Sequence, residues 1–347
     1  MCTLEVRVDD DAVAGRLCDG HAGPDGRCDS VLSFLGRRVL YMVPTLFLIS
    51  IAAFVIIQLP PGDYATSYVA RLEAEGQSVD TAQLEALQSR YGLGDPMLAQ
   101  YWKWISGIVF HLDFGYSFEY AAPVGGLLAD RLPLTVLLSL STLLFTWAVA
   151  LPIGVYSALK QYSVGDYIVT TIGFLGLATP NFLLALIMMW LAFSTFGLSV
   201  GTNNLPTLII AIIVLGTAGT AGLIRILRAN LLDELRKPYV VAARAQGMAE
   251  GPLLLRYPLR VALNPFISTI GWLLPGIIGG EVIVAQVANL STIGPLLLGA
   301  LRSQDMYLAG SIILITAVLT VIGTLLSDLA LAWADPRVRL RTVGGGA

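Results

Sequence analysis

The sequence predicts an all-α polytopic membrane protein with six transmembrane helices. Hydrophobic residues make up 56% of its 347 residues and charged residues only 13%, with a mean hydropathy of +0.74. This composition excludes an ordinary soluble domain. Lys and Arg are also unevenly distributed between the loops. A bilayer span needs about 20 mostly apolar residues, and six segments qualify: 38–59, 132–157, 168–196, 206–227, 265–289 and 308–333.

The charge distribution predicts which loops lie inside the cell. With the N-terminus inside, sixteen of the 21 Lys and Arg residues fall on the cytoplasmic side, which follows the positive-inside rule and places both termini in the cytoplasm. Residues 1–30 are rich in Asp and Gly and carry no apolar periodicity, so we expect a disordered cytoplasmic tail. Residues 342–347 form a C-terminal tail.

Two connecting segments are long enough to carry structure. The predicted outer loop covers residues 63–131, where Asp80 and Gln83 predict a capped helix. Tyr101, Trp102 and Trp104 are typical of residues at a membrane interface. The predicted cytoplasmic loop covers residues 228–264.

The cytoplasmic loop contains a short run of small residues, PYVVAARAQG, between two apolar spans. Pro238 suits the first turn of a helix, and Gly247 is a natural place for the helix to end. The alanines allow another surface to approach the backbone closely. We therefore predict a short helix outside the bilayer that a partner protein grips.

This run resembles the cytoplasmic coupling loop of ABC importer permeases, in which an E-A-A-x-x-x-G motif docks into a groove of the ATPase subunit. It is most similar to the dipeptide, oligopeptide and nickel branch, whose loop reads like Y-V-R-T-A-R-A-K-G. Val241 stands where the general motif has Glu, and Gln246 replaces a usual Lys. The resemblance assigns ATPase coupling to Tyr239, Val240, Ala242, Ala243, Arg244, Ala245, Gln246 and Gly247.

Other motifs resemble the same branch in the expected order. The first span ends in P-P-G-D, A-T-P-N-F occurs at 178–182, and D-P-R-V-R follows the last span at 335–339. The resemblance therefore covers residues 31–341 and implies the type I ABC importer permease fold with a cytoplasmic coupling helix.

Three residues are candidates for the translocation pathway or its gate. Glu281 lies in the predicted fifth span, where a carboxylate costs about 2.5–3.5 kcal/mol and should face protein or water. The alternative is a helix-packing carboxylate bonded to backbone. Pro180 and Asn181 either line the pathway or form a packed structural kink, and the kink is the favoured interpretation.

The outer turn after the fifth span resembles the R-D-Y/F turn of the branch, with Gln304 in place of Arg and followed by Asp305. Together with Tyr116 of the outer loop, these residues are predicted to contact a solute-binding protein. Packing of this region on the spans is the alternative. The run GTAGTAG at 216–222 predicts close helix packing.

The resemblance implies a permease subunit of an ATP-driven, binding-protein-dependent importer in the bacterial inner membrane. Its expected partners are a second related permease in a heterodimer, two ATPase subunits, an extracytoplasmic solute-binding protein and membrane lipid, with no nucleic acid. The chain has no G-x-x-x-x-G-K-S/T motif, so ATP and Mg²⁺ are expected in the ATPase subunits. We expect no catalytic residue, metal or cofactor in this chain.

Dipeptides or oligopeptides are the default solutes of the branch. Oligosaccharides or glycosides are the alternative, because the turn at 288–310 departs from the usual pattern. Nickel is least favoured, since no His or Cys lies in the predicted spans. An integral membrane enzyme would need converging catalytic groups such as H-E-x-x-H, and a secondary transporter would need inverted repeats around an ion site. The sequence supports neither.

Overall fold

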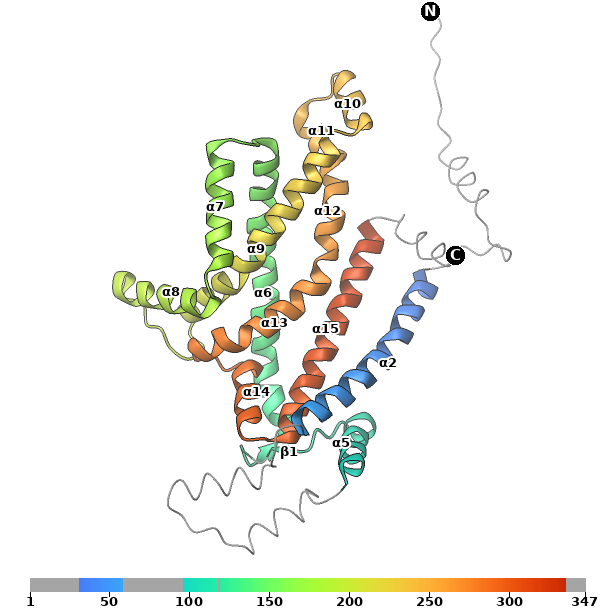
Figure 1. Cartoon of the computed structure of the whole chain (residues 1–347), viewed down its shortest axis with the longest axis vertical. Helices are drawn as coiled ribbons and strands as arrows, with labels where there is room; N and C mark the ends of the chain where they lie inside the picture. Colours follow the sequence, from blue (N-terminus) through green and yellow to red (C-terminus); the bar gives the residue numbers. More distant parts are fainter. Residues whose placement is uncertain (1–30, 59–95, 118, 335–347) are drawn as a thin grey trace, which may run out of the picture.

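The computed structural model describes residues 31–58, 96–117 and 119–334, and these are almost entirely helical (Figure 1). The predicted helix near Asp80 and Gln83 and both predicted tails lie outside the described residues. The small strands β1 (Tyr116–Ser117) and β2 (Ala122–Pro123) pair in antiparallel register. The prediction of an all-α polytopic membrane protein is therefore confirmed in outline.

Four helices of the described residues are long and apolar enough to cross a membrane. Their sequences carry nearly continuous hydrophobic runs, as expected for helices that meet lipid on one side and protein on the other. They correspond to four of the six predicted spans. These helices are α2 (Val31–Gln58), α6 (Val124–Leu159), α9 (Leu205–Leu235) and α15 (Met306–Ala334).

The predicted third span is not one straight helix. It consists of α7 (Val164–Ala178) and α8 (Asn181–Phe196), which meet at an angle of 107°. Pro180 causes the break, because its ring disfavours helical backbone at the preceding residue, and Thr179 is indeed extended. In Figure 1 α8 leaves the stack of upright helices sideways.

The predicted fifth span is also divided. Residues 265–289 cover the end of α12 (Pro258–Ser268) and all of α13 (Ile270–Val287), which join at Thr269. The apolar stretches Ile277–Val287 and α14 (Ile293–Arg302) are each too short to span a bilayer alone. The prediction of six transmembrane helices is therefore not confirmed: the described residues hold four long spans and one bent pair.

The remaining helices lie at opposite ends of the molecule (Figure 1). Helix α5 (Met97–His111) packs beside β1 at one end, and α10 (Pro238–Ala245) and α11 (Glu250–Arg256) project from the other. Of the aromatics predicted at the interface, Trp102 is exposed, whereas Trp104 is buried and stacks on Phe54. Trp104 thus fastens α5 to α2 rather than facing lipid.

Helices α6 and α9 pack against each other along much of their length. A Cβ atom added at Gly216 of α9 would lie 2.5 Å from Phe145 Cδ1 and 3.1 Å from Thr146 Oγ1 of α6. At the other end of the contact, a Cβ at Gly154 of α6 would lie 3.0 Å from Leu227 Cδ2. Small residues therefore set the distance between the two helices, and the prediction of close packing is confirmed at Gly216.

We predict that Gly216→Ala destabilises the chain by about 1–3 kcal/mol, because the new methyl group overpacks the α6–α9 contact. Thermal unfolding of the purified protein in detergent measures the effect. Gly222→Ala is the matched control, since nothing lies within 4 Å of the added Cβ atom in the same helix. An equal loss of stability in both variants would contradict this assignment.

Candidate functional site

Helix α10 follows α9 almost directly and is anchored to its end. Only Arg236 and Lys237 separate the two helices, and the Tyr239 hydroxyl donates to the Glu234 carboxylate at 2.5 Å. Val240 is fully buried, so one face of α10 packs inward. The short linker and this hydrogen bond therefore join α10 to the end of α9.

The opposite face of α10 is open. Of the eight residues that the sequence assigns to coupling, Val240 is buried and Ala243 half-buried. Gly247 ends the segment with a φ of +83°, a conformation that favours glycine, and nothing lies within 4 Å of an added Cβ. The other six are exposed: Tyr239, Ala242, Arg244, Ala245, Gln246 and Gly247.

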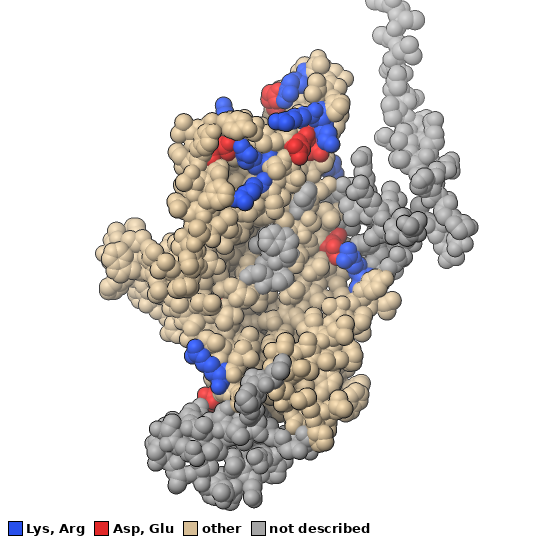
Figure 2. Space-filling model, in the orientation of Figure 1, with Lys and Arg blue, Asp and Glu red and all other residues tan. Residues whose placement is uncertain are grey.

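Charge gathers around this end of the molecule, whereas the middle of the face shown in Figure 2 is nearly free of it. Arg244 of α10 donates to Glu250 of α11 at 2.5 and 3.1 Å. This hydrogen bond raises the pKa of Arg244 and lowers that of Glu250. Burial, together with the Glu234 carboxylate, raises the pKa of Tyr239 to about 12, so the phenol stays a hydrogen-bond donor at neutral pH.

Glu281 lies in α13 and is only 1% exposed. The hydroxyls of Thr292 and Thr135 approach its carboxyl group. However, neither carboxyl oxygen completes a hydrogen bond of normal geometry within the described chain. Thr135 instead accepts from the Ile293 amide at 3.0 Å. In this conformation the carboxyl group is thus enclosed by protein, and no backbone partner explains its presence.

The α7–α8 elbow lies beside the same helix. Asn181, the first residue of α8, places Nδ2 3.9 Å from a Cβ built at Gly280, next to Glu281. Pro180 is exposed at the bend and precedes α8 without a side-chain cap. The structure therefore brings Asn181 to the segment that bears Glu281, and Pro180 has the kink-forming role.

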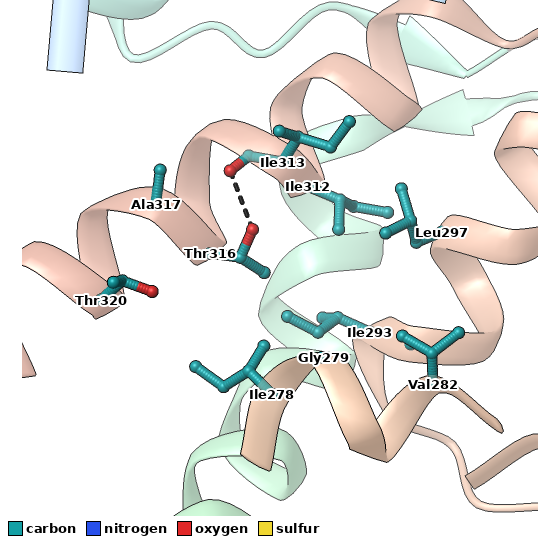
Figure 3. Close-up of a pocket in the computed structure, with 11 residues that line it drawn as sticks. Ile278, Gly279, Val282, Ile293, Leu297, Ile312, Ile313, Thr316, Ala317 and Thr320 are labelled. Carbon is teal, nitrogen blue, oxygen red and sulfur yellow. Dashed lines mark hydrogen bonds between the residues drawn. The ribbon is translucent and has the colours of Figure 1, made fainter. Parts of the chain in front are cut away.

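An apolar cavity of approximately 290 Å³ lies between α13, α14 and α15 (Figure 3). Ile278, Gly279 and Val282 line it from α13, and Thr316 and Thr320 line it from α15. The Thr316 hydroxyl donates a hydrogen bond to the Ile313 carbonyl at 2.8 Å. Among the described residues that line the cavity, none carries a charged side chain.

The residues predicted to contact a binding protein cluster at the end opposite α10 (Figure 1). Asp305 is fully buried. It accepts from the Ser117 hydroxyl at 2.6 Å and from the Leu308 amide at 3.2 Å, and so caps α15. Gln304 is half-buried with a φ of +57° between α14 and α15. Tyr116 is exposed on β1, so of these three it presents the most side-chain surface.

Comparisons with known proteins agree with this architecture. The family model for the binding-protein-dependent transport system inner membrane component matches residues 150–340, and the model for the N-terminal part of such components matches residues 31–140. The chain belongs to this family. It is therefore a multi-pass membrane permease of the peptide and nickel branch of ABC importers.

Two relatives illustrate the range of the branch. The permease is 36% identical to the oligopeptide transport system permease protein AppB of Bacillus subtilis (strain 168), over 88% of this chain and 99% of the relative. It is 30% identical to the nickel import system permease protein NikB of Staphylococcus aureus (strain MRSA252), over 88% and 91%. These relatives differ in the solute that their names give.

Sequence reasoning missed a buried polar cluster in this permease. Asp166 of α7 is 4% exposed and accepts hydrogen bonds from Ser157, the Tyr162 amide and Arg228. A signal was present: Ser163 and Asp166 form an S-x-x-D pattern at the start of a helix. Ser163 does cap α7 by accepting from the Asp166 amide. The pattern gave no hint that Arg228 would join the cluster from α9.

We predict that Glu281→Leu raises the thermal stability of the permease and that Glu281→Gln does not lower it. The reason is that a buried carboxyl group without hydrogen-bond partners is destabilising by about 1–3 kcal/mol. Differential scanning fluorimetry of the purified protein measures both variants. If both unfold at a lower temperature than the wild type, the carboxyl group makes a stabilising contact in the folded chain.

Proposed function

We propose that this permease carries oligopeptides or dipeptides across the bacterial inner membrane as one subunit of an ATP-driven importer. Membership of the binding-protein-dependent family supports the importer role. A second related permease would complete the pathway, two ATPase subunits would supply energy, and an extracytoplasmic binding protein would deliver the solute. Lipid would surround the exposed apolar faces of the spans.

The observation that carries the proposal is the geometry of α10. This helix stands clear of the apolar body (Figure 1) and is joined to α9 by the Tyr239–Glu234 hydrogen bond. It exposes the small residues Ala242, Ala245 and Gly247 among larger polar side chains. A short helix with small exposed residues fits a groove in a partner, because large side chains would hold the backbones apart. We assign that groove to an ATPase subunit.

We propose that ATP closes the two ATPase subunits and moves the α10 helices of the two permeases toward each other. This movement would switch the spans from an inward-facing to an outward-facing arrangement, a shift between two packed states. The binding protein would then release its solute into the open pathway. ATP and Mg²⁺ would bind to the ATPase subunits, not to this chain.

The proposed orientation places the α10 end in the cytoplasm. The start of α2 and the end of α15 lie toward this same end (Figure 1), where Arg38 pairs with Asp328 at 3.0 Å. The predicted excess of Lys and Arg in the loops of this end supports the assignment. Both termini would then be cytoplasmic, and the Tyr116 end would face the binding protein.

Peptides are the favoured solute for two reasons. The oligopeptide permease relative is more similar in sequence than the nickel permease relative, at 36% against 30% identity. The predicted spans also contain no His or Cys, the soft or intermediate ligands that suit nickel. Neither of these two relatives is named for oligosaccharide transport, so that alternative is not favoured.

We predict that Gly247→Arg leaves membrane insertion intact and abolishes solute-stimulated ATP hydrolysis in liposomes. The long charged side chain would block the groove, and the left-handed backbone would be strained by about 1 kcal/mol. Gly247→Asn is the matched control, since Asn tolerates this conformation and adds little bulk. Full stimulated hydrolysis by the Arg variant would show that α10 is not the coupling element.

The solute is tested by native mass spectrometry of the solute-binding protein that stimulates ATP hydrolysis by the assembled importer. We expect bound masses separated by amino-acid residue increments. A bound nickel ion, or masses separated by hexose units, would reject peptides while leaving the importer role intact.

A further inference from the structure

We infer that the ion pair between Asp166 and Arg228 makes α6, α7 and α9 one rigid body that carries the movement of α10 to the α7–α8 elbow. The two residues are positioning residues, because they act on the pathway through the helices that they join. The inference rests on the proposed function, since it takes α10 as the point where the ATPase acts.

Asp166 is the centre of the cluster. Its buried carboxylate accepts from the Ser157 hydroxyl of α6 and from the Tyr162 amide of the α6–α7 turn at 3.0 Å. Arg228 Nη2 of α9 donates to Asp166 Oδ2 at 3.0 Å. The carboxylate is therefore shared by two helices besides its own. Removing the arginine would leave a buried charge without its counter-charge, which is strongly unfavourable.

Arg228 lies near the end of α9 that bears α10. Arg228 lies seven positions before Leu235, the last residue of α9, which is about 10 Å of helical rise. The Arg228 side chain is only 28% exposed. A force on α10 thus reaches the ion pair through the short turn that the Tyr239–Glu234 hydrogen bond fixes, and then through the last two turns of α9.

From the ion pair, contacts between α7 and α9 continue to the elbow. Arg225 places its guanidinium carbon 4.7 Å from the Phe174 ring centroid, a favourable cation–π geometry. Nearer the bend, a Cβ at Gly176 would lie 2.9 Å from Thr217 Cγ2. The interface is therefore tight from the first turn of α7 almost to Pro180, so α7 cannot tilt away from α9 without breaking it.

Helix α8, which follows the α7–α8 elbow, packs on α13, the helix that bears Glu281. Ala185 of α8 and Val284 of α13 are fully buried in one hydrophobic cluster with Val214 of α9. Asn181 approaches the same helix beside Gly280. A displacement of α9 would therefore shift α8 and α13 together, which is the kind of connection that a gate at Glu281 requires.

The first experiment measures rigidity directly by pulsed electron paramagnetic resonance on the assembled importer. Cys2, Cys18 and Cys28 are replaced by Ser, and spin labels are attached at Tyr162→Cys and Arg236→Cys, both exposed sites. We expect one narrow distance that is the same with and without ATP. In Asp166→Asn and Arg228→Gln the distance should broaden or change with ATP. A wild-type distance that changes with ATP would overturn the inference.

The second experiment measures uptake of radiolabelled trialanine per ATP hydrolysed in liposomes. We expect this ratio to fall about fivefold or more in Asp166→Asn and Arg228→Gln, while hydrolysis stays within about twofold of wild type. The double variant should resemble each single variant, because the pair acts as a unit. A merely structural role would lower uptake and hydrolysis together through lost assembly, and that outcome would also reject the inference.

Two further variants serve as controls. Asp328→Asn removes a different interhelical pair, Arg38–Asp328, at the same end of the molecule but away from α9, and should keep the wild-type ratio. Arg228→Lys retains the charge and should recover much of the coupling. If Arg228→Gln does not accumulate, Asp166→Asn, which breaks the same pair, carries the test. Loss of ATP hydrolysis stimulated by the binding protein in the wild-type complex would instead reject the proposed function.

Discussion

The close contact between α6 and α9 is the constraint on which the rest of the permease depends. Gly216 and Gly154 let the two helices approach, so that Thr146 Oγ1 lies 3.4 Å from the Gly216 carbonyl. Neighbouring elements are then placed on this pair: α7 rests on α9, α12 packs along it, and α13 crosses it. In a membrane, where helices gain little from hydrophobic association, such close packing is a main source of stability.

Buried polar side chains also lie along helix α6 of this pair. The buried residues of α6 include Thr135, Ser139 and Thr142 on one face, and the hydroxyls of Ser139 and Thr142 have no partner among the described residues. At one end of this face Thr135 holds the Ile293 amide near Glu281, and beyond the other end Ser157 holds Asp166. Helix α6 therefore links the surroundings of the two buried carboxyl groups, Glu281 and Asp166.

Hydropathy predicted the long spans well and the interrupted ones poorly. Residues 168–196 and 265–289 are apolar throughout, so a window of hydropathy cannot separate a straight span from two helices that meet at Pro180 or Thr269. Local signals did better: the order of Pro238, the alanines and Gly247 predicted α10 almost to the residue. The Asp166–Arg228 pair joins residues 62 positions apart, and the burial of Asp305 depends on Ser117, which lies 188 positions away. Such contacts depend on tertiary packing, which no local pattern encodes.

The hydroxyl face of α6 also has a consequence for how the permease is made. Its packing partner α9 begins only after α7 and α8 have been synthesised, a delay of a few seconds at about 5–20 residues per second. During that interval the Thr146 hydroxyl can donate to the Thr142 carbonyl of its own helix but not to the Gly216 carbonyl of α9. A helix whose hydroxyl is bonded to its own backbone can enter hydrocarbon before its partner. The close contact between α6 and α9 therefore forms only once α9 has been translated.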